Sequence, residues 1–380
     1  MSDQPAVTPP VVEDTAADVA EVRVTWAELF FDLVFVFAVT EVSTSLRDDQ
    51  TWLGVVHAIV VFVPIYWVWV GTCVYANTHM VDTAVERLGI FTIALIGLFM
   101  ALAVPDAYHG RGVLFAGSYV AARLVLLWLA KRGGKKAPIT YLVAALVAGP
   151  LLLLGAFLPP LPRLLVWAAA GAVDLASSAL GRRLLQRVQF APGHLAERFG
   201  GFLIIALGES IVAIGAPAAA AKQLTAGTLG AVAAAFVLAC ALWWVYYVFA
   251  AVAVRHSLET STTQGDIIRR VLSYGHLAFI GAVIAVAVGL AQAIAHPDVR
   301  LAAGAAGLLF GGSALYLATF GYTRWRMFRT VSRTRLSAAA AVVVLSPVSL
   351  FVPALAALSV LALVVVALNV VEHWMVRRAS

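Results

Sequence analysis

Long apolar runs separated by short polar connectors make up most of this chain. A transmembrane helix needs about 20 mostly apolar residues, and twelve such runs can be counted. The first six lie near 26–46, 53–75, 87–105, 112–131, 139–158 and 163–181. The second six lie near 196–216, 226–252, 269–292, 300–322, 336–352 and 354–373, the last two being compressed around SPVSLFVP. The pattern predicts an all-α polytopic membrane protein with about twelve transmembrane helices.

The composition agrees with a membrane protein and argues against a nucleic-acid binder. Hydrophobic residues make up 62% of the chain and charged residues 12%, unlike the balance of soluble domains. The formal charge is +6, but the basic residues gather in every second connector, at KRGGKK (131–136), RRLLQR (182–187), Arg255 with Arg269 and Arg270, RWRMFR (324–329), and Arg377 with Arg378. Because connectors rich in Lys and Arg stay in the cytoplasm, we expect both termini there, the lipid bilayer as partner and no nucleic acid.

The remaining simple features predict neither a leader nor a cofactor site. Residues 1–24 have no basic start and no apolar core, so we interpret them as a disordered cytoplasmic tail and not as a signal peptide. Cys73 and Cys240 each lie inside an apolar run, where a free thiol behaves as a small buried hydrophobe. We therefore expect no disulfide, no metal site and no cofactor.

The two halves of the chain show similar motifs in the same order. AELFFDLVFVFAVTEV (27–42) aligns with AERFGGFLIIALGESI (196–211), YWVWV (66–70) with LWWVYY (242–247), and Gly117-Ser118 with Gly312-Ser313. This order predicts two six-helix repeats, 25–190 and 191–380. Since six is even, the repeats should share one orientation, with a central pathway between them. Asp32 aligns with Gly201, so the halves differ in chemistry.

Two carboxylates lie in the first predicted span. Glu28 and Asp32 are four residues apart and therefore share one helix face. A charge at a helix centre costs about 2.5–3.5 kcal/mol on insertion scales, so such groups usually face the bundle interior or a wet cavity. Two alternatives remain open: Glu28 as an interfacial carboxylate at a helix N-terminus, and Asp32 as one partner of a structural ion pair.

Arg123 and Asp174 provide a partner set for these acids. Both fall in the predicted cytoplasmic half of their spans, at a depth similar to that of Asp32. Two acids and one base in contact would leave one carboxylate free to bind a proton or cation. The sequence therefore predicts a network of Asp32, Arg123 and Asp174.

The seventh span has a second acidic pattern. Glu197, Gly201, Gly208 and Gly215 share one face, which predicts close helix packing through the glycines. Glu209 points to another face and is the second half's best functional candidate. His57 and His276 also lie within spans, where a hydrogen-bonding packing role and a proton relay are both open.

The segments TWAELFFDLVFVFAVTEVSTSL (25–46) and HLAERFGGFLIIALGESIVAIG (194–215) resemble the two hallmark segments of the bacterial low temperature requirement A family. ELFFDLVF (28–35) is the most specific part. The resemblance implies a multipass protein of the bacterial cell membrane and no known passenger or reaction. The spacing of Glu28, Asp32 and Phe35 is also similar to the first helix of a potassium channel family with six-span repeats, but Phe31-Asp32-Leu33 replaces that family's Ser-Asp-Gly.

The function predicted from these features is transport. We expect a transporter or channel for a proton, small cation or small solute, with Glu28, Asp32, Arg123, Asp174, Glu197 and Glu209 along its pathway. A structural or sensory membrane protein is the alternative. An intramembrane enzyme is disfavoured because the chain contains neither Gly-x-Ser-x-Gly nor His-Glu-x-x-His.

Overall fold

The computed structural model describes residues 24–79, 81–132, 138–181, 188, 190–261 and 263–379. Within these ranges no β-strand occurs, and twelve helical segments are long and apolar enough to cross a membrane. They are Trp26–Asp48, Trp52–Thr78, Ala84–Asp106, Gly112–Lys131, Ile139–Ala156, Pro160–Leu180, Pro192–Ala220, Ala226–Thr260, Gln264–Ala295, Ala303–Phe328, Arg333–Leu350 and Ala354–Arg378. The predicted all-α class and the count of twelve spans are confirmed.

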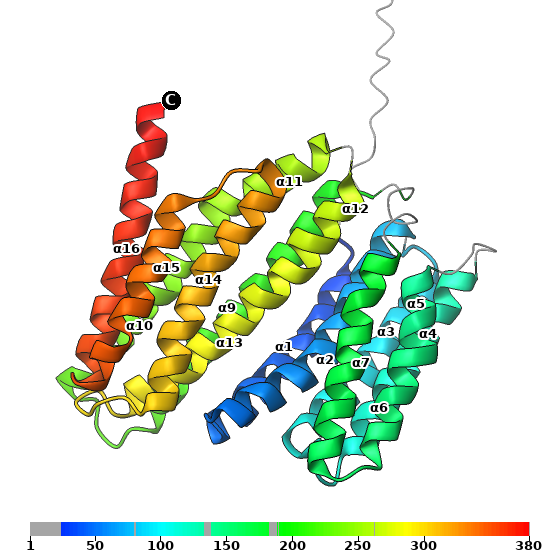
Figure 1. The fold of residues 1–380 in the computed structure, drawn as a ribbon, viewed down its shortest axis with the longest axis horizontal. Coiled ribbons are helices and arrows are strands. Elements are labelled where there is room, and N and C mark those ends of the chain that lie inside the picture. Colours follow the sequence, from blue (N-terminus) through cyan, green and yellow to red (C-terminus); the bar gives the residue numbers. More distant parts are fainter. Residues whose placement is uncertain are drawn as a thin grey trace, which may run out of the picture.

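Several spans consist of more than one helical element (Figure 1). The first half contains α1 (Trp26–Asp48), α2 (Trp52–Thr78), α3 (Ala84–Ala103), η1 (Val104–Asp106), α4 (Gly112–Lys131), α5 (Ile139–Val143), η2 (Ala144–Ala148), α6 (Gly149–Ala156) and α7 (Pro160–Leu180). The second half contains α9 (Pro192–Ala220), α10 (Ala226–Trp244), η3 (Val245–Ala250), α11 (Ala251–Thr260), α12 (Gln264–Ile267), η4 (Ile268–Ser273), α13 (Tyr274–Ala295), α14 (Ala303–Phe328), α15 (Arg333–Leu345), η5 (Pro347–Leu350) and α16 (Ala354–Ala379). Elements η2, η3 and η4 are π-helical insertions inside otherwise α-helical spans.

Some helices extend beyond the predicted apolar runs. The eighth span continues to Thr260 and the ninth begins at Gln264, so Arg255, Arg269 and Arg270 lie on helices and not in a loop. A hydropathy pattern detects only the part of a helix that matches the hydrocarbon core, whereas backbone hydrogen bonding continues into the polar flanks. The tail up to residue 23, the connector 182–187 and most of 131–136 lie outside the described residues.

The helices form two groups that meet along a junction (Figure 1). In the first group α1 packs on α2 and α3, α3 on α4, α4 on α6, α6 on α7 and α2 on α7. In the second group α9 packs on α10 and α13, α13 on α14, α14 on α15, α15 on α16 and α10 on α16. The junction is formed where α1 and α2 face α9 and α13. These four helices make the main contact between the two groups.

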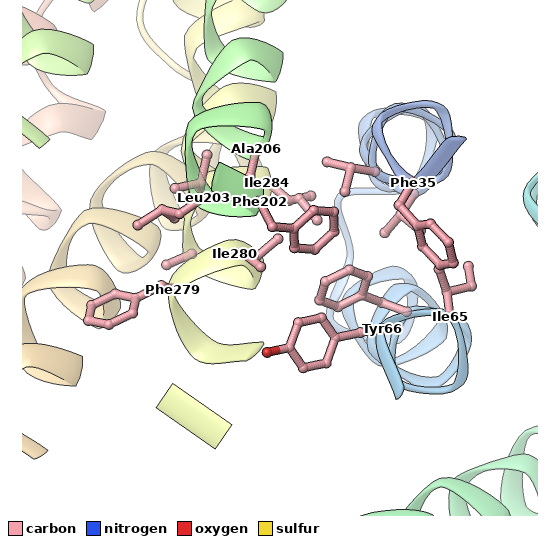
Figure 2. Packing of buried hydrophobic residues seen from close by; sticks show 14 of the residues in the cluster. Phe35, Ile65, Tyr66, Phe202, Leu203, Ala206, Phe279, Ile280 and Ile284 are labelled. Carbon is pink, nitrogen blue, oxygen red and sulfur yellow. The ribbon is translucent and has the colours of Figure 1, made fainter. Parts of the chain in front are cut away.

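Aromatic and branched side chains fill the junction. Figure 2 shows buried residues contributed by both groups, with Phe35, Ile65 and Tyr66 of the first group facing Phe202, Ile280 and Ile284 of the second. Leu203 and Phe279 point away from this junction, into the second group. Trp69 of α2 stacks on Phe202 of α9, with 4.2 Å between the ring centroids. Since stacked aromatic pairs are worth about 0.5–1.5 kcal/mol beyond their buried area, this layer joins the two groups firmly.

The α13–α14 contact depends on glycine, which provides a test of the packing. A Cβ atom at Gly289 would lie 2.5 Å from Leu309 Cβ and 2.9 Å from the carbonyl oxygen of Ala305. We expect Gly289→Ala to lower the free energy of unfolding by about 1–3 kcal/mol, the usual cost of overpacking. The measurement is unfolding by SDS titration in mixed micelles, followed by circular dichroism.

Gly281→Ala is the matched control for this substitution. Gly281 lies on the same helix, but no atom comes within 4 Å of the position of its Cβ. This variant should unfold as the wild type does. Equal losses in both variants would mean that helix geometry, and not the α13–α14 contact, sets the requirement for glycine.

Candidate functional site

A helix-capping interaction positions the first acid of the site. Thr25 precedes α1 and forms a capping box with Glu28: the Thr25 hydroxyl accepts from the Glu28 backbone N–H, and Glu28 Oε2 accepts from the Thr25 backbone N–H at 2.8 Å. Such boxes satisfy backbone donors that a helix start leaves unpaired. Glu28 nevertheless does not lie at the surface, because only 1% of the residue is exposed. Capping therefore holds this carboxylate in a buried position.

One turn further along α1, Asp32 contacts both groups of helices. Its Oδ1 accepts from Arg198 Nη2 of α9 at 2.8 Å and from Trp69 Nε1 of α2 at 2.7 Å. Arg198 Nη2 also donates to Cys73 Sγ at 3.3 Å, and Arg198 Nη1 lies 3.8 Å from Glu28 Oε1. Asp32 is 2% exposed and Arg198 is 1% exposed. One buried guanidinium therefore serves both carboxylates.

Hydrogen bonds to both ring nitrogens of His194, on α9, define where its ring proton lies. Asn77 Oδ1 accepts from the backbone N–H of Ala191, so its Nδ2 is the atom that faces His194 Nδ1 at 3.1 Å. Because Nδ2 is a donor, Nδ1 must accept, and the single ring proton lies on Nε2. Nε2 then donates to Glu28 Oε2 at 3.2 Å. His194 is neutral in this arrangement.

The formal charges of this cluster do not cancel. Glu28 and Asp32 contribute two negative charges when ionised, Arg198 contributes one positive charge, and His194 and Cys73 contribute none. Their balance is therefore −1. A buried charge without a partner is costly in a low-dielectric interior, and this cost is what drives such a group to bind a cation or a proton. We refer to Glu28, Asp32, His194 and Arg198 as the junction cluster.

Arg123 and Asp174 form a separate buried pair. Arg123 Nη2 of α4 donates to Asp174 Oδ2 of α7 at 2.7 Å, and the Tyr119 hydroxyl donates to the same oxygen at 2.5 Å. The predicted network of Asp32, Arg123 and Asp174 is thus divided, since the recorded basic partner of Asp32 is Arg198. The reason is geometric: α4 and α7 pack within the first group, whereas α1 faces α9 across the junction.

A small cavity adjoins this pair. Its volume is about 60 Å³, which leaves room for more than one water molecule. Arg123 and Asp174 line it together with η4 of the second group, which contributes Ile268, Arg269 and Ser273. Three buried polar atoms of its lining residues have no hydrogen-bond partner in the structure, namely Arg123 Nε, Asp174 Oδ1 and Arg269 Nε. The cavity thus combines a mainly apolar wall with three unpaired polar atoms, and residues of both groups of helices line it.

Glu209 lies at the junction near the opposite end of α1. Its Oε2 accepts from the Thr40 hydroxyl at 2.7 Å, and its Oε1 is 3.9 Å from Arg47 Nη2. The Glu209 side chain is 2% exposed and that of Arg47 39% exposed. A cavity of about 400 Å³ opens beside Arg47, lined also by Gln50, Val212, Ala213, Ala216, Pro217, Ala291, Gln292, Ala295 and His296. Arg47 thus connects a buried acid to an open vestibule.

The two acidic levels are separated by the aromatic layer. Asp32 and Thr40 are eight residues apart on α1, a rise of about 12 Å along the axis, and Phe35 and Val39 are buried between them. On α9 the buried Phe202 and Ala206 lie between Arg198 and Glu209. The junction therefore alternates polar, apolar and polar along the direction of the spans.

Glu197 and the three glycines that share its face of α9 lie open, unlike the buried site residues described above. Glu197 is exposed and lines a surface groove on α9. Gly201, Gly208 and Gly215 have no atom within 4 Å of their Cβ positions, so the predicted helix packing through this face is wrong within the described chain. Spacing alone identifies a face of small residues but not whether a helix covers it.

The structure confirms the expected burial of Cys73 but not that of Cys240, and it gives His276 a partner on each ring nitrogen. Cys73 is buried and Cys240 is exposed, and both are free thiols. His276 Nε2 pairs with the Tyr246 hydroxyl at 2.6 Å, while its Nδ1 lies 3.0 Å from the carbonyl oxygen of Leu272. Both ring nitrogens thus have partners, which favours the packing role for His276. Among the described residues, no group of three or more His, Cys, Asp or Glu side chains has the arrangement of a metal site.

Sequence reasoning did not select His194 and Arg198 as site residues. Their signal was present, because they are four residues apart in the second hallmark segment, as Glu28 and Asp32 are in the first. Two acids and two bases at equal spacing on two helices can face each other in register. The charges were complementary, but the contact between α1 and α9 was not visible in the sequence.

The comparisons with known proteins agree with the resemblance of these segments. The model of the family described as bacterial low temperature requirement A protein (LtrA) matches residues 23–370. An uncharacterized protein of Rhizobium meliloti (strain 1021) is 32% identical over 330 residues, covering 82% of this chain and 79% of that protein. No solved structure matches the chain. With its twelve membrane-spanning helices and both hallmark segments at the junction, this chain belongs to the bacterial low temperature requirement A family.

Proposed function

We propose that this protein moves a proton or small cation across the bacterial cell membrane through the junction of its two groups of helices. The observation that carries the proposal is the balance of the junction cluster, where Glu28 and Asp32 share the single guanidinium of Arg198. A buried charge excess is expensive in a bilayer and usually marks an ion pathway or proton relay. Packing alone would be served by a balanced pair.

The alternation along the junction supports a gated pathway. The vestibule beside Arg47 and Glu209 provides an entrance, and the junction cluster provides a second polar level. The buried layer around Phe35 and Phe202 separates them, as hydrophobic constrictions do in closed pores and carriers. Relative rocking of the two groups would open this layer to one side at a time.

The same packing order in the two groups supports an internal repeat. The pairs α1–α3, α3–α4 and α2–α7 correspond to α9–α13, α13–α14 and α10–α16. We propose that 25–190 and 191–380 are two six-helix repeats of one orientation, with both termini in the cytoplasm. In Figure 1 the C-terminal end of α11, the start of α12 and the C-terminal end of α16 lie at the same end of the bundle, which supports this orientation.

Ion flux in proteoliposomes tests the proposed function. We expect wild-type protein to carry protons, Na⁺ or K⁺ under imposed gradients, and Asp32→Asn to reduce that flux at least about tenfold, a change equivalent to about 1.4 kcal/mol in a rate barrier. Asparagine keeps an oxygen for Trp69 and Arg198 but loses the charge. Internal pH and ion-sensitive dyes provide the measurement.

Glu259→Gln is the matched control for this experiment. Glu259 is an exposed acid paired with Arg255 at 2.9 Å, at the end of α11, and it lies outside the junction. Its removal should leave flux unchanged. Well-folded Asp32→Asn protein with wild-type flux would instead favour the structural alternative, in which the acids only fix helix packing.

A further inference from the structure

The recorded partners of the junction cluster's carboxylates are hydrogen-bond donors. Glu28 Oε2 accepts from the Thr25 backbone N–H, the Thr25 hydroxyl and His194 Nε2. Asp32 Oδ1 accepts from Trp69 Nε1 and Arg198 Nη2. A bound metal cation needs the opposite environment, in which several oxygen atoms direct lone pairs at one point. The donors around these acids therefore leave no set of oxygen ligands for Na⁺ or K⁺.

A proton fits the same surroundings. It adds to one carboxylate oxygen and needs no cavity. Glu28 Oε1 is buried and accepts no hydrogen bond in the structure, although His194 Nε2, which donates to Oε2, also lies 3.2 Å from it. This oxygen lies 3.8 Å from Arg198 Nη1, on the side that Arg198 shares with Asp32. One added proton turns the formal charge of the cluster from −1 to zero. No second cation is required.

The surroundings of His194 argue against this side chain as the carrier of the proton. A proton on Nδ1 would face Nδ2 of Asn77, which is itself a donor and is fixed by the backbone of Ala191. Two donors in contact repel, so the imidazole stays neutral while it orients Glu28 through Nε2. His194 is thus a positioning residue whose tautomer is set by Asn77.

We propose that the passenger of the junction cluster is a proton, bound by the pair Glu28 and Asp32 while Asn77 keeps His194 neutral. This inference rests on the proposed transport function and names its substrate. The proton adds to a carboxylate oxygen from one side and leaves to the other, with no bond broken except O–H on release. The charged and titratable side chains that contact the two carboxylates are His194 and Arg198 of α9. The thiol of Cys73 on α2 contacts Arg198.

The test compares ion selectivity in proteoliposomes that contain the full chain. With Na⁺ and K⁺ replaced by N-methylglucamine, we expect proton flux to persist, and a tenfold change in the proton gradient to shift the reversal potential by about 59 mV. A reversal potential that follows Na⁺ or K⁺ would overturn the proton assignment and leave transport standing. Absence of flux for every ion would overturn the transport function itself, and the assignment with it.

A second measurement examines His194 without relying on flux. In protein labelled with ¹⁵N-histidine, the His194 signals are identified by their loss in His194→Gln. We expect one protonated ring nitrogen, Nε2, and an unprotonated Nδ1 at neutral pH, and Asn77→Leu should remove the preference between the two tautomers. A doubly protonated ring in the wild type would overturn the assignment, because His194 would then supply the missing positive charge.

Discussion

Replacing Arg198 by methionine is expected to lower the free energy of unfolding by about 3–5 kcal/mol, the cost of removing one partner of a buried ion pair. Methionine fills a similar length of the space and removes only the guanidinium. Glu28 and Asp32, which are 1% and 2% exposed in the wild type, would then lose the guanidinium that faces both of them. The measurement is SDS titration in mixed micelles, with the yield of folded protein recorded alongside.

The control for this prediction removes the charges on both sides. The triple variant Glu28→Gln, Asp32→Asn and Arg198→Met contains no charge at the cluster, so it should recover most of the lost stability. Neutral amides need only hydrogen bonds, and Trp69 and Thr25 still donate them. A loss below about 1 kcal/mol in Arg198→Met, the value of exposed ion pairs, would show that water reaches the acids.

Replacing Arg123 by methionine is expected to have the second largest effect, again about 3–5 kcal/mol and towards the lower end of that range. Asp174 would lose the guanidinium that pairs with it, but the Tyr119 hydroxyl would still donate to its Oδ2. Both Arg123 and Asp174 are 2% exposed. Unfolding in mixed micelles provides the measurement here as well.

A double-mutant cycle separates this pair from its surroundings. Asp174→Asn alone leaves Arg123 as an uncompensated buried cation and should be costly too, whereas the combination Arg123→Met and Asp174→Asn should cost less than the sum of the single changes. Contacting charged residues usually show coupling of about 0.5–3 kcal/mol. Additive effects would mean that the two side chains do not act as a pair.

The pair of Arg335 and Glu372 shows what a balanced structural ion pair looks like in the same protein. Arg335 Nε and Nη2 donate to Glu372 Oε1 and Oε2 at 2.8 and 2.9 Å, joining α15 to α16. Thr334 donates to the same carboxylate. One acid here meets one base in a bidentate contact, which is the geometry of a stable clamp. The junction cluster differs because two acids share one base, and this difference is what argues for transport.

Hydropathy alone is enough to establish the membrane-spanning architecture of this protein. Length and hydrophobicity identify a transmembrane helix because a bilayer of fixed thickness requires a long apolar segment whose backbone satisfies its own hydrogen bonds. The twelve spans follow from this requirement, and so does the expectation that Glu28 and Asp32 turn inward. Arg123 with Asp174 was also visible, because both residues lie at similar depth.

Which side chains meet depends on how the helices pack. Asp32 contacts Arg198, 166 residues away, and not Arg123, because the packing of α1 against α9 is set by side-chain shape across the junction and not by local pattern. The same reason explains why the glycines of α9 lie open although their spacing suggests a packed face. Depth in the membrane follows from the sequence of one helix, whereas contact depends on how two helices rotate and pack against each other.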